Sequence, residues 1–269
     1  MAPDLKAVFE QMAQRFPDDM VEEQLWDLPR IVFNTQLILD RAGTDVRICD
    51  IGAGVGMFGA GCAELGMQMT MMDDFETPYD EAALAEALPN VPDSINFTRA
   101  HNVLDLHRGL GVQIMQRDPL AEGFGFPPNS LDVVSTFGSM EHWHNSPKLL
   151  FASVMEALVP GGWFVLSAPN CVSFAKRVKV PLGLAKWSQI ADWYEATRFR
   201  GHVREPDVSD LRYIAEDMGL VDIEIIGRTW MGQMSPRPAI RLAARMLDRL
   251  LRPWPTLCGD LYLVGRKPR

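Results

Sequence analysis

The sequence predicts an α/β fold in which helices cover both faces of a mostly parallel sheet. Short apolar segments, rich in β-branched residues or methionine, alternate along the chain with longer segments of helical periodicity. Glycines mark strand boundaries, because Gly52, Gly54 and Gly56 follow one apolar segment and the pair at 161–162 precedes another. A chain of 269 residues can bury one generous core, so we expect one domain over 1–269.

Seven segments are strand candidates. They are short, apolar and bounded by turn or helical signals, and they span 46–51, 67–73, 111–118, 131–137, 163–170, 221–227 and 258–267. Helical periodicity is expected around them, over 5–42 (interrupted by FPDD at 16–19), 55–65, 79–88, 96–110, 146–158, 206–220 and 237–252. The third strand has an alternative, since 95–102 (INFTRAHN) also has strand character.

Composition and charge disfavour several classes of protein. A formal net charge of −9 disfavours a nucleic-acid partner, because proteins that bind nucleic acid carry a basic footprint. The N-terminus lacks the basic start and apolar run of a signal peptide, and the chain has no apolar stretch of about 18 residues. The four cysteines are scattered without CxxC pairing, so we expect reduced thiols, no metal site and a cytoplasmic location.

The segment DIGAGVG (50–56) lies between the first strand and the next helix and is the clearest ligand-binding signal. Its glycines tolerate positive φ and let the backbone approach a ligand closely. Gly54 to Gly59 also satisfies GxGxxG, with Asp73 downstream, so a dinucleotide oxidoreductase is one interpretation. Asp50 favours another, because a carboxylate at the strand end suits the ammonium and sulfonium charges of S-adenosylmethionine and would repel a pyrophosphate.

Five segments together carry a resemblance to a known family. They are VRICDIGAGVG (46–56), TMMDDF (70–75), MQRDPL (115–120), FPPNSLDVVSTFGSMEH (126–142) and LVPGGWFVLSAPN (158–170). On these motifs the chain resembles class I S-adenosylmethionine-dependent methyltransferases of the type 11-like group, strongly over 45–170 and more loosely over 201–227. The resemblance implies a Rossmann-like sheet of seven strands in which the last strand is antiparallel.

The resemblance also implies which residues hold S-adenosylmethionine. These are Asp50, Ile51, Gly52, Ala53, Gly54 and Gly56 around its amino acid moiety, Asp73 at the ribose, Asp118 at the adenine and Phe137 at the border of the site. Two alternatives remain open: Asp74 at the ribose and, if 95–102 is the third strand, Asn102 at the adenine. The chain then divides into N-terminal helices (1–45), a cofactor-binding core (46–170), a lid or acceptor insert (171–205) and the C-terminal helices with the last two strands (206–269).

Two short segments supply candidate residues for the acceptor side. EHWHNS (141–146) follows the fourth strand, at the sheet edge where ligands gather, and GHVRE (201–205) precedes the last crossover helix. The expected catalytic bases are His142 and His202, and the expected substrate-binding residues are Glu141, His144, Arg204 and Glu205. Structural alternatives are a cofactor-lining Glu-His pair at 141–142, a solvated histidine at 144 and a helix-capping ion pair within 202–205. GHVRE resembles a segment of bacterial methyltransferases associated with surface glycans and other secondary products.

The leading functional hypothesis is an S-adenosylmethionine-dependent methyltransferase that methylates an oxygen of a small molecule or of a glycan or lipid-linked intermediate. Two alternatives are an NAD(P)-dependent oxidoreductase and a non-catalytic protein that retains the methyltransferase fold. The fold and the cofactor do not determine the acceptor, so the sequence leaves oxygen, nitrogen and carbon acceptors open.

The helix expected at 237–252 has an unusual charge distribution for an acidic protein. Its arginines, at positions 237, 241, 245, 249 and 252, recur at three- and four-residue spacing and form a basic face opposite an apolar one. Trp230 and Trp254 flank it. The pattern predicts either a helix that packs its apolar face on the domain or one that makes peripheral membrane contact. It does not predict an oligomeric state.

Overall fold

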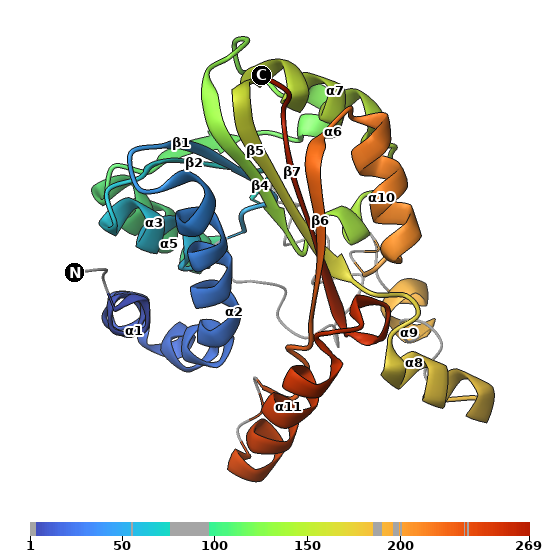
Figure 1. Ribbon diagram of the computed structural model, residues 1–269. Helices are drawn as coiled ribbons and strands as arrows, with labels where there is room; N and C mark the ends of the chain where they lie inside the picture. The colour runs from blue at the N-terminus through green and yellow to red at the C-terminus, as the bar shows by residue number, and fades with distance from the viewer. Residues whose placement is uncertain are drawn as a thin grey trace.

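The computed structural model describes residues 4–54, 56–75, 97–184, 190–195, 199, 201–233, 235 and 237–269. A seven-stranded sheet runs through the molecule in the order β3-β2-β1-β4-β5-β7-β6 (Figure 1). Its strands are β1 Arg47–Ile51, β2 Gln68–Asp73, β3 Gln113–Gln116, β4 Leu131–Phe137, β5 Leu158–Pro169, β6 Val221–Arg228 and β7 Asp260–Arg266. β7 is antiparallel to β5 and β6, and the other neighbouring pairs are parallel. This arrangement confirms the predicted fold class.

Helices connect and cover the strands. The described α-helices are α1 Leu5–Ala13, α2 Asp18–Ala42, α3 Phe58–Glu64, α5 Phe97–Gly109, α6 Pro119–Glu122, α7 Lys148–Ala157, α8 Phe174–Lys179, α9 Ile190–Tyr194, α10 Val208–Asp217 and α11 Pro238–Leu251. Three 3₁₀ turns are η1 Met140–His142, η2 Val180–Leu182 and η3 Pro255–Leu257. None of these helices is long and apolar enough to cross a membrane. The helix predicted at 79–88 lies outside the described residues.

The structure decides two boundaries that the sequence left open or placed wrongly. The third strand is β3 at 113–116, whereas 97–109 is helical, so the strand alternative at 95–102 is wrong. β5 begins at Leu158, five residues before the predicted start at 163. The strand extends backward because Leu158 pairs with Leu131 at the start of β4, and the glycine turn interrupts the register without ending the strand.

Apolar cores on both faces hold the helices against the sheet. In β1, Ile48 packs in the core shared with α1, α2, α3 and α5, while its neighbour Cys49 packs in the core shared with α7 and α10. Figure 1 shows these two groups of helices on opposite sides of the strands. Alternate residues of the strand are therefore buried on both faces, as expected for a parallel sheet.

Local sequence fixes how the helices meet the site. Asp207 caps α10 by accepting hydrogen bonds from the amides of Ser209 and Asp210, so the helix begins directly after the segment 201–205. In α3, a Cβ on Gly61 would overlap the ring of Phe9, so glycine lets α1 lie directly against α3. The first turn of α3 is thereby held beside the end of β1, where the glycine loop begins.

Candidate cofactor and active site

The glycine loop leaves the carboxyl end of β1 with two residues in the left-handed region. Gly52 and Gly54 have φ of 68° and 55°. A Cβ on Gly52 would overlap the side chain of Ser139, whereas a Cβ on Gly54 would meet no atom within 4 Å. Gly52 is therefore required for packing as well as for backbone geometry, and Gly54 borders open space that a ligand can occupy.

Asp73, at the end of β2, binds the glycine loop directly. Its Oδ2 accepts a hydrogen bond from the Gly54 amide at 2.8 Å, and its Oδ1 accepts one from the Phe75 amide at 3.0 Å. Burial raises the pKa of Asp73 to about 6, although both amide bonds favour the ionised form. The structure thus places the acid predicted for the ribose within bonding distance of the loop predicted for the amino acid moiety.

Asp50 lies at the same edge, almost completely buried. Its Oδ1 accepts a hydrogen bond of 2.6 Å from Ser135 Oγ on the neighbouring strand β4. Burial is the main cause that raises the pKa of Asp50 to about 7; the Ser135 bond opposes the rise and the negative charge of Asp73 adds to it. A positive charge bound beside Asp50 and Asp73 would lower the pKa of both carboxyls and favour their ionised forms, so this edge of the sheet suits a cationic ligand.

The border residues predicted for the cofactor occupy the neighbouring strand ends. Phe137, the last residue of β4, packs edge-to-face on Phe58 with ring centroids 5.1 Å apart. Asp118 follows β3 and caps α6 by accepting a hydrogen bond from the Leu120 amide at 2.9 Å. The alternative adenine contact, Asn102, lies within helix α5 and not at a strand end, so its premise is wrong. Asp74 follows Asp73 outside the strand.

The N-terminal helix α2 contributes to the site, which the sequence interpretation missed. Gln24 is buried and its Oε1 accepts a hydrogen bond from the Met57 amide at 3.1 Å, at the start of α3. One turn and a half further on, Arg30 makes two hydrogen bonds to Asp27, of 2.7 and 2.6 Å, and lies next to Gly138 after β4. The sequence feature that could have indicated this contribution is the presence of polar residues, such as Gln24, among the apolar positions of the amphipathic helix.

The two acceptor-side segments meet in space. The Glu141 carbonyl accepts hydrogen bonds from the amides of Val203 and Arg204, at 2.6 and 3.3 Å, which join η1 to the segment 201–205. The rings of His142 and His202 meet edge-to-face with centroids 4.8 Å apart. A pair of histidines from segments 60 positions apart in sequence is therefore brought to one point at the carboxyl edge of the sheet.

A carboxylate orients one of these histidines. His202 Nδ1 lies 2.7 Å from Glu205 Oε1, and Glu205 also pairs with the ammonium of Lys176 in α8. The bond to Glu205 raises the pKa of His202. Burial acts to raise the pKa of Glu205, but the bonds to His202 and Lys176 outweigh it and lower that pKa. The pair therefore favours an ionised Glu205 and a more basic imidazole whose Nε2 lies on the side away from the carboxylate.

Glu141 is the most buried acid of this cluster. Its Oε2 has no hydrogen-bond partner in the part of the chain that the structure describes, and burial raises its pKa to about 7. One ligand atom each from Glu141, His142 and His202 lies within 4.8 Å of the others. A carboxylate and two imidazoles at this separation can share a proton or hold a metal ion, so the geometry does not distinguish the two roles, and the absence of a metal stays a prediction.

His144 and Arg204 line a separate cleft between α7 and α10. Its volume is about 1030 Å³, and its wall includes Trp143, Phe151 and Tyr213. Arg204 is exposed and lies 3.6 Å from Asp210. None of the glycine-loop residues that the structure describes lines this cleft. Met140, Trp143 and Val203 also line the cleft, so His144 and Arg204 lie next to the cluster formed by Glu141, His142, His202 and Glu205.

Solved structures with the same fold are S-adenosylmethionine-dependent methyltransferases. One from Archaeoglobus fulgidus has a TM-score of 0.52 at 17% identity, covering 90% of this chain and 94% of its own. One from Mesorhizobium loti has a TM-score of 0.51 at 20% identity, covering 90% and 97%. Phosphoethanolamine N-methyltransferase 2 of Haemonchus contortus, in complex with phosphomonomethylethanolamine and S-adenosylhomocysteine, has a TM-score of 0.51 at 17% identity, covering 88% and 53%.

Fold and site together define a methyltransferase whose methyl donor is S-adenosylmethionine. The chain belongs to the methyltransferase-domain family, which it matches over residues 3–225. No curated protein sequence matches it. The strand-end carboxylates and the open space at Gly54 fit a cationic cofactor better than a dinucleotide pyrophosphate, so the GxGxxG spacing is not evidence for an oxidoreductase here.

Proposed function

We propose that this enzyme methylates a hydroxyl oxygen of a small molecule or glycan, with His202 and His142 removing the proton. The observation that carries the proposal is the His202–Glu205 pair, which lies against His142 at the sheet edge where the cofactor loop begins. When bound, S-adenosylmethionine would supply a methyl group activated by sulfonium charge: the acceptor oxygen bonds to the methyl carbon, the carbon–sulfur bond breaks, S-adenosylhomocysteine leaves, and the hydroxyl proton passes to a base. The protein must align the acceptor and accept that proton.

The proposed cofactor contacts follow the geometry of the strand ends. Asp50 and the backbone of 51–54, with Gly56, surround the amino acid moiety, Asp73 binds the ribose, and Asp118 meets the adenine. Asp73 already accepts two backbone hydrogen bonds, so its carboxylate is oriented before the ribose hydroxyls arrive. Phe137 borders the site through its contact with the first turn of α3.

Proton removal is the proposed role of the histidines. Glu205 holds Nδ1 of His202, which favours the tautomer with hydrogen on Nδ1 and a lone pair on Nε2. The imidazolium that forms is stabilised by the same carboxylate, and the buried carboxyl of Glu141 lies beside it as a further proton acceptor. His144 and Arg204, on the cleft between α7 and α10, are proposed to bind a distal part of the acceptor.

The test combines product identification with variants. Protein is incubated with S-adenosylmethionine carrying a labelled methyl group and a panel of phenols, sugars and hydroxy acids, and the methylated atom is identified by mass spectrometry. His202→Ala should reduce turnover about 10²- to 10⁴-fold while calorimetric affinity for S-adenosylmethionine stays within about twofold. Arg108→Ala, on the surface of α5, is the matched control. Methyl transfer to nitrogen or carbon, or near-normal turnover in both His142→Ala and His202→Ala, would overturn the proposal.

A further inference from the structure

Helix α11 presents its apolar face to solvent. Leu242, Met246 and Leu250 follow one another at four-residue spacing and are 61%, 65% and 64% exposed. The buried positions of the helix are Ala244, Asp248 and Leu251, a narrow stripe beside the apolar face. Figure 1 shows α11 extending away from the end of the sheet. Most of the apolar face therefore does not pack on the described part of the domain, because Leu242, Met246 and Leu250 lie in solvent and the buried positions fall on the stripe beside them.

A second group of elements exposes large apolar side chains. It comprises α8, η2 and α9, which follow β5, and its exposed residues include Leu182, Leu184, Ile190, Trp193 and Tyr194. Isolated exposed apolar residues are ordinary on a soluble protein, but several large ones on successive elements indicate an interaction surface.

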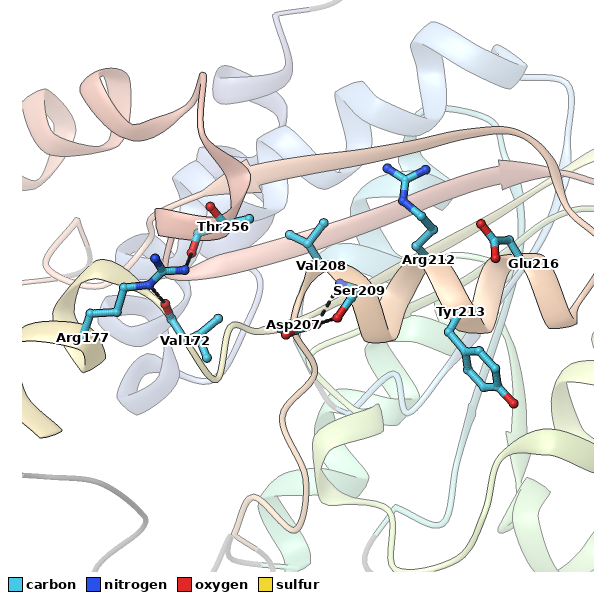
Figure 2. Close-up of a pocket in the computed structure, with 9 residues that line it drawn as sticks. All are labelled: Val172, Arg177, Asp207, Val208, Ser209, Arg212, Tyr213, Glu216 and Thr256. Carbon is cyan, nitrogen blue, oxygen red and sulfur yellow. Dashed lines mark hydrogen bonds between the residues drawn. The ribbon is translucent and has the colours of Figure 1, made fainter.

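The two groups lie at the same end of the molecule. α8 follows the end of β5 and α11 follows the end of β6, and these strands run in the same direction because both are antiparallel to β7. Arg177 of α8 donates a hydrogen bond of 3.2 Å to the carbonyl of Thr256, in the turn after α11 (Figure 2). The glycine loop and η1 also leave this carboxyl edge, after β1 and β4. The apolar surface and the active site therefore share one end of the fold.

Positive charge accompanies the apolar residues in a protein whose formal net charge is −9. Arg245 and Arg249 are exposed along α11, and Lys179 is exposed at the end of α8. The single acid of α11, Asp248, is buried and neutralised by Arg228 and Arg252. A helix with an exposed apolar face and exposed arginines along its flank is typical of binding in the interface of an anionic bilayer.

We propose that α11, with α8, η2 and α9, docks this enzyme on the surface of an anionic lipid bilayer. Leu242, Met246 and Leu250 enter the headgroup boundary, and Arg245 and Arg249 pair with lipid phosphates. A second copy of the chain is a poorer occupant, since two copies meeting on this face would bring their arginines together. Trp254 is exposed and available for the interface, but Trp230 is buried, with its Nε1 donating to the Tyr262 hydroxyl at 2.9 Å, and takes no part.

The docking proposal extends the proposed function and rests on it in one respect, the choice of acceptor. Docking turns the active-site edge toward the membrane, so the acceptor is an amphiphile or a lipid-linked glycan presented there. A soluble acceptor would not require this orientation. Docking itself does not depend on the acceptor and is tested without one.

Vesicle flotation tests the proposal on the full chain. The wild type should float with vesicles of phosphatidylcholine and phosphatidylglycerol at low salt, and the bound fraction should fall several-fold at about 0.5 M salt or with pure phosphatidylcholine. The triple variant Leu242→Ser, Met246→Ser, Leu250→Ser and the double variant Arg245→Glu, Arg249→Glu should each lose at least about tenfold in apparent affinity. Leu149→Ser, an exposed apolar position on α7, is the matched control and should float like the wild type.

Two further measurements keep the outcome decisive. Calorimetric affinity for S-adenosylmethionine should be unchanged in every variant, which shows that the fold and the cofactor site are intact and tests the methyltransferase assignment separately from docking. Sedimentation velocity reports self-association. Wild-type protein that stays in the soluble fraction at low salt, triple-variant protein that floats normally, or a wild-type dimer that the triple variant abolishes would overturn the bilayer proposal.

Discussion

Replacing the buried carboxylate of Asp50 by an amide should stabilise the empty enzyme and weaken its affinity for the cofactor. Burial raises the pKa of Asp50 from an ordinary value near 4 to about 7. At 1.36 kcal/mol per pKa unit, the ionised carboxylate of the folded, empty protein costs about 4 kcal/mol at pH 8. Asp50→Asn removes this cost and retains a carbonyl oxygen that accepts the hydrogen bond from Ser135. Its new amide hydrogens need partners, which offsets part of the gain. We therefore expect the free energy of unfolding to rise by about 1–3 kcal/mol.

The sign of the pH dependence follows from the direction of the shift. Between about pH 4 and 7 the unfolded chain releases the Asp50 proton and the folded protein keeps it, so the contribution of this group to stability falls as pH rises through that window. The free energies of unfolding of the wild type and Asp50→Asn should therefore be similar near pH 4.5 and diverge toward pH 8. Urea denaturation at several pH values measures the difference. Asp132→Asn is the control, for which the pH dependence of stability should have the opposite sign. The hydrogen bond from Arg47 lowers the pKa of Asp132, so its ionised form stabilises the folded protein.

Cofactor binding should change in the opposite sense. A charge-assisted contact contributes about 1.5–3 kcal/mol, so the affinity of Asp50→Asn for S-adenosylmethionine should fall about 10- to 150-fold. Calorimetry in buffers of different ionisation enthalpy should detect proton release on binding below pH 7 in the wild type and less of it in the variant. Stability that does not diverge with pH would refute the burial argument, and unchanged affinity would refute the contact with the cofactor.

Three further predictions concern the same site. Asp73→Ala should weaken both S-adenosylmethionine and S-adenosylhomocysteine by at least about tenfold in calorimetry, and equal affinity in a folded variant would contradict the ribose assignment. Gly54→Val should abolish binding of S-adenosylmethionine, because φ is 55° at this position and the added side chain enters the space of the ligand, while the circular dichroism spectrum stays near that of the wild type. Retained binding would show that the loop does not approach the cofactor. Turnover should rise with pH, with an apparent pKa above the ordinary histidine value of about 6.5, because Glu205 raises the pKa of His202. Glu205→Gln should lower this apparent pKa. An apparent pKa that does not change in the variant would show that another group is the base.

Local patterns in the sequence were sufficient for the order of most elements and for locating the glycine loop. Strand and helix periods differ, so the order of elements follows from spacing alone, and three glycines with Asp50 mark a strand end that a ligand can approach. Asp73 could be located from its distance along the chain, because consecutive parallel strands end at the same edge of the sheet. These features depend on neighbours in sequence or on a regular crossover.

Only the tertiary structure decided features that depend on packing between distant segments. It made 97–109 a helix, placed Gln24 of α2 on the first turn of α3, and brought His142 against His202. It also left Leu242, Met246 and Leu250 in solvent, although the amphipathic pattern of α11 is equally compatible with burial. A sequence period defines which face of a helix is apolar, but the surface that covers that face is set by the path of the rest of the chain and by what the protein binds.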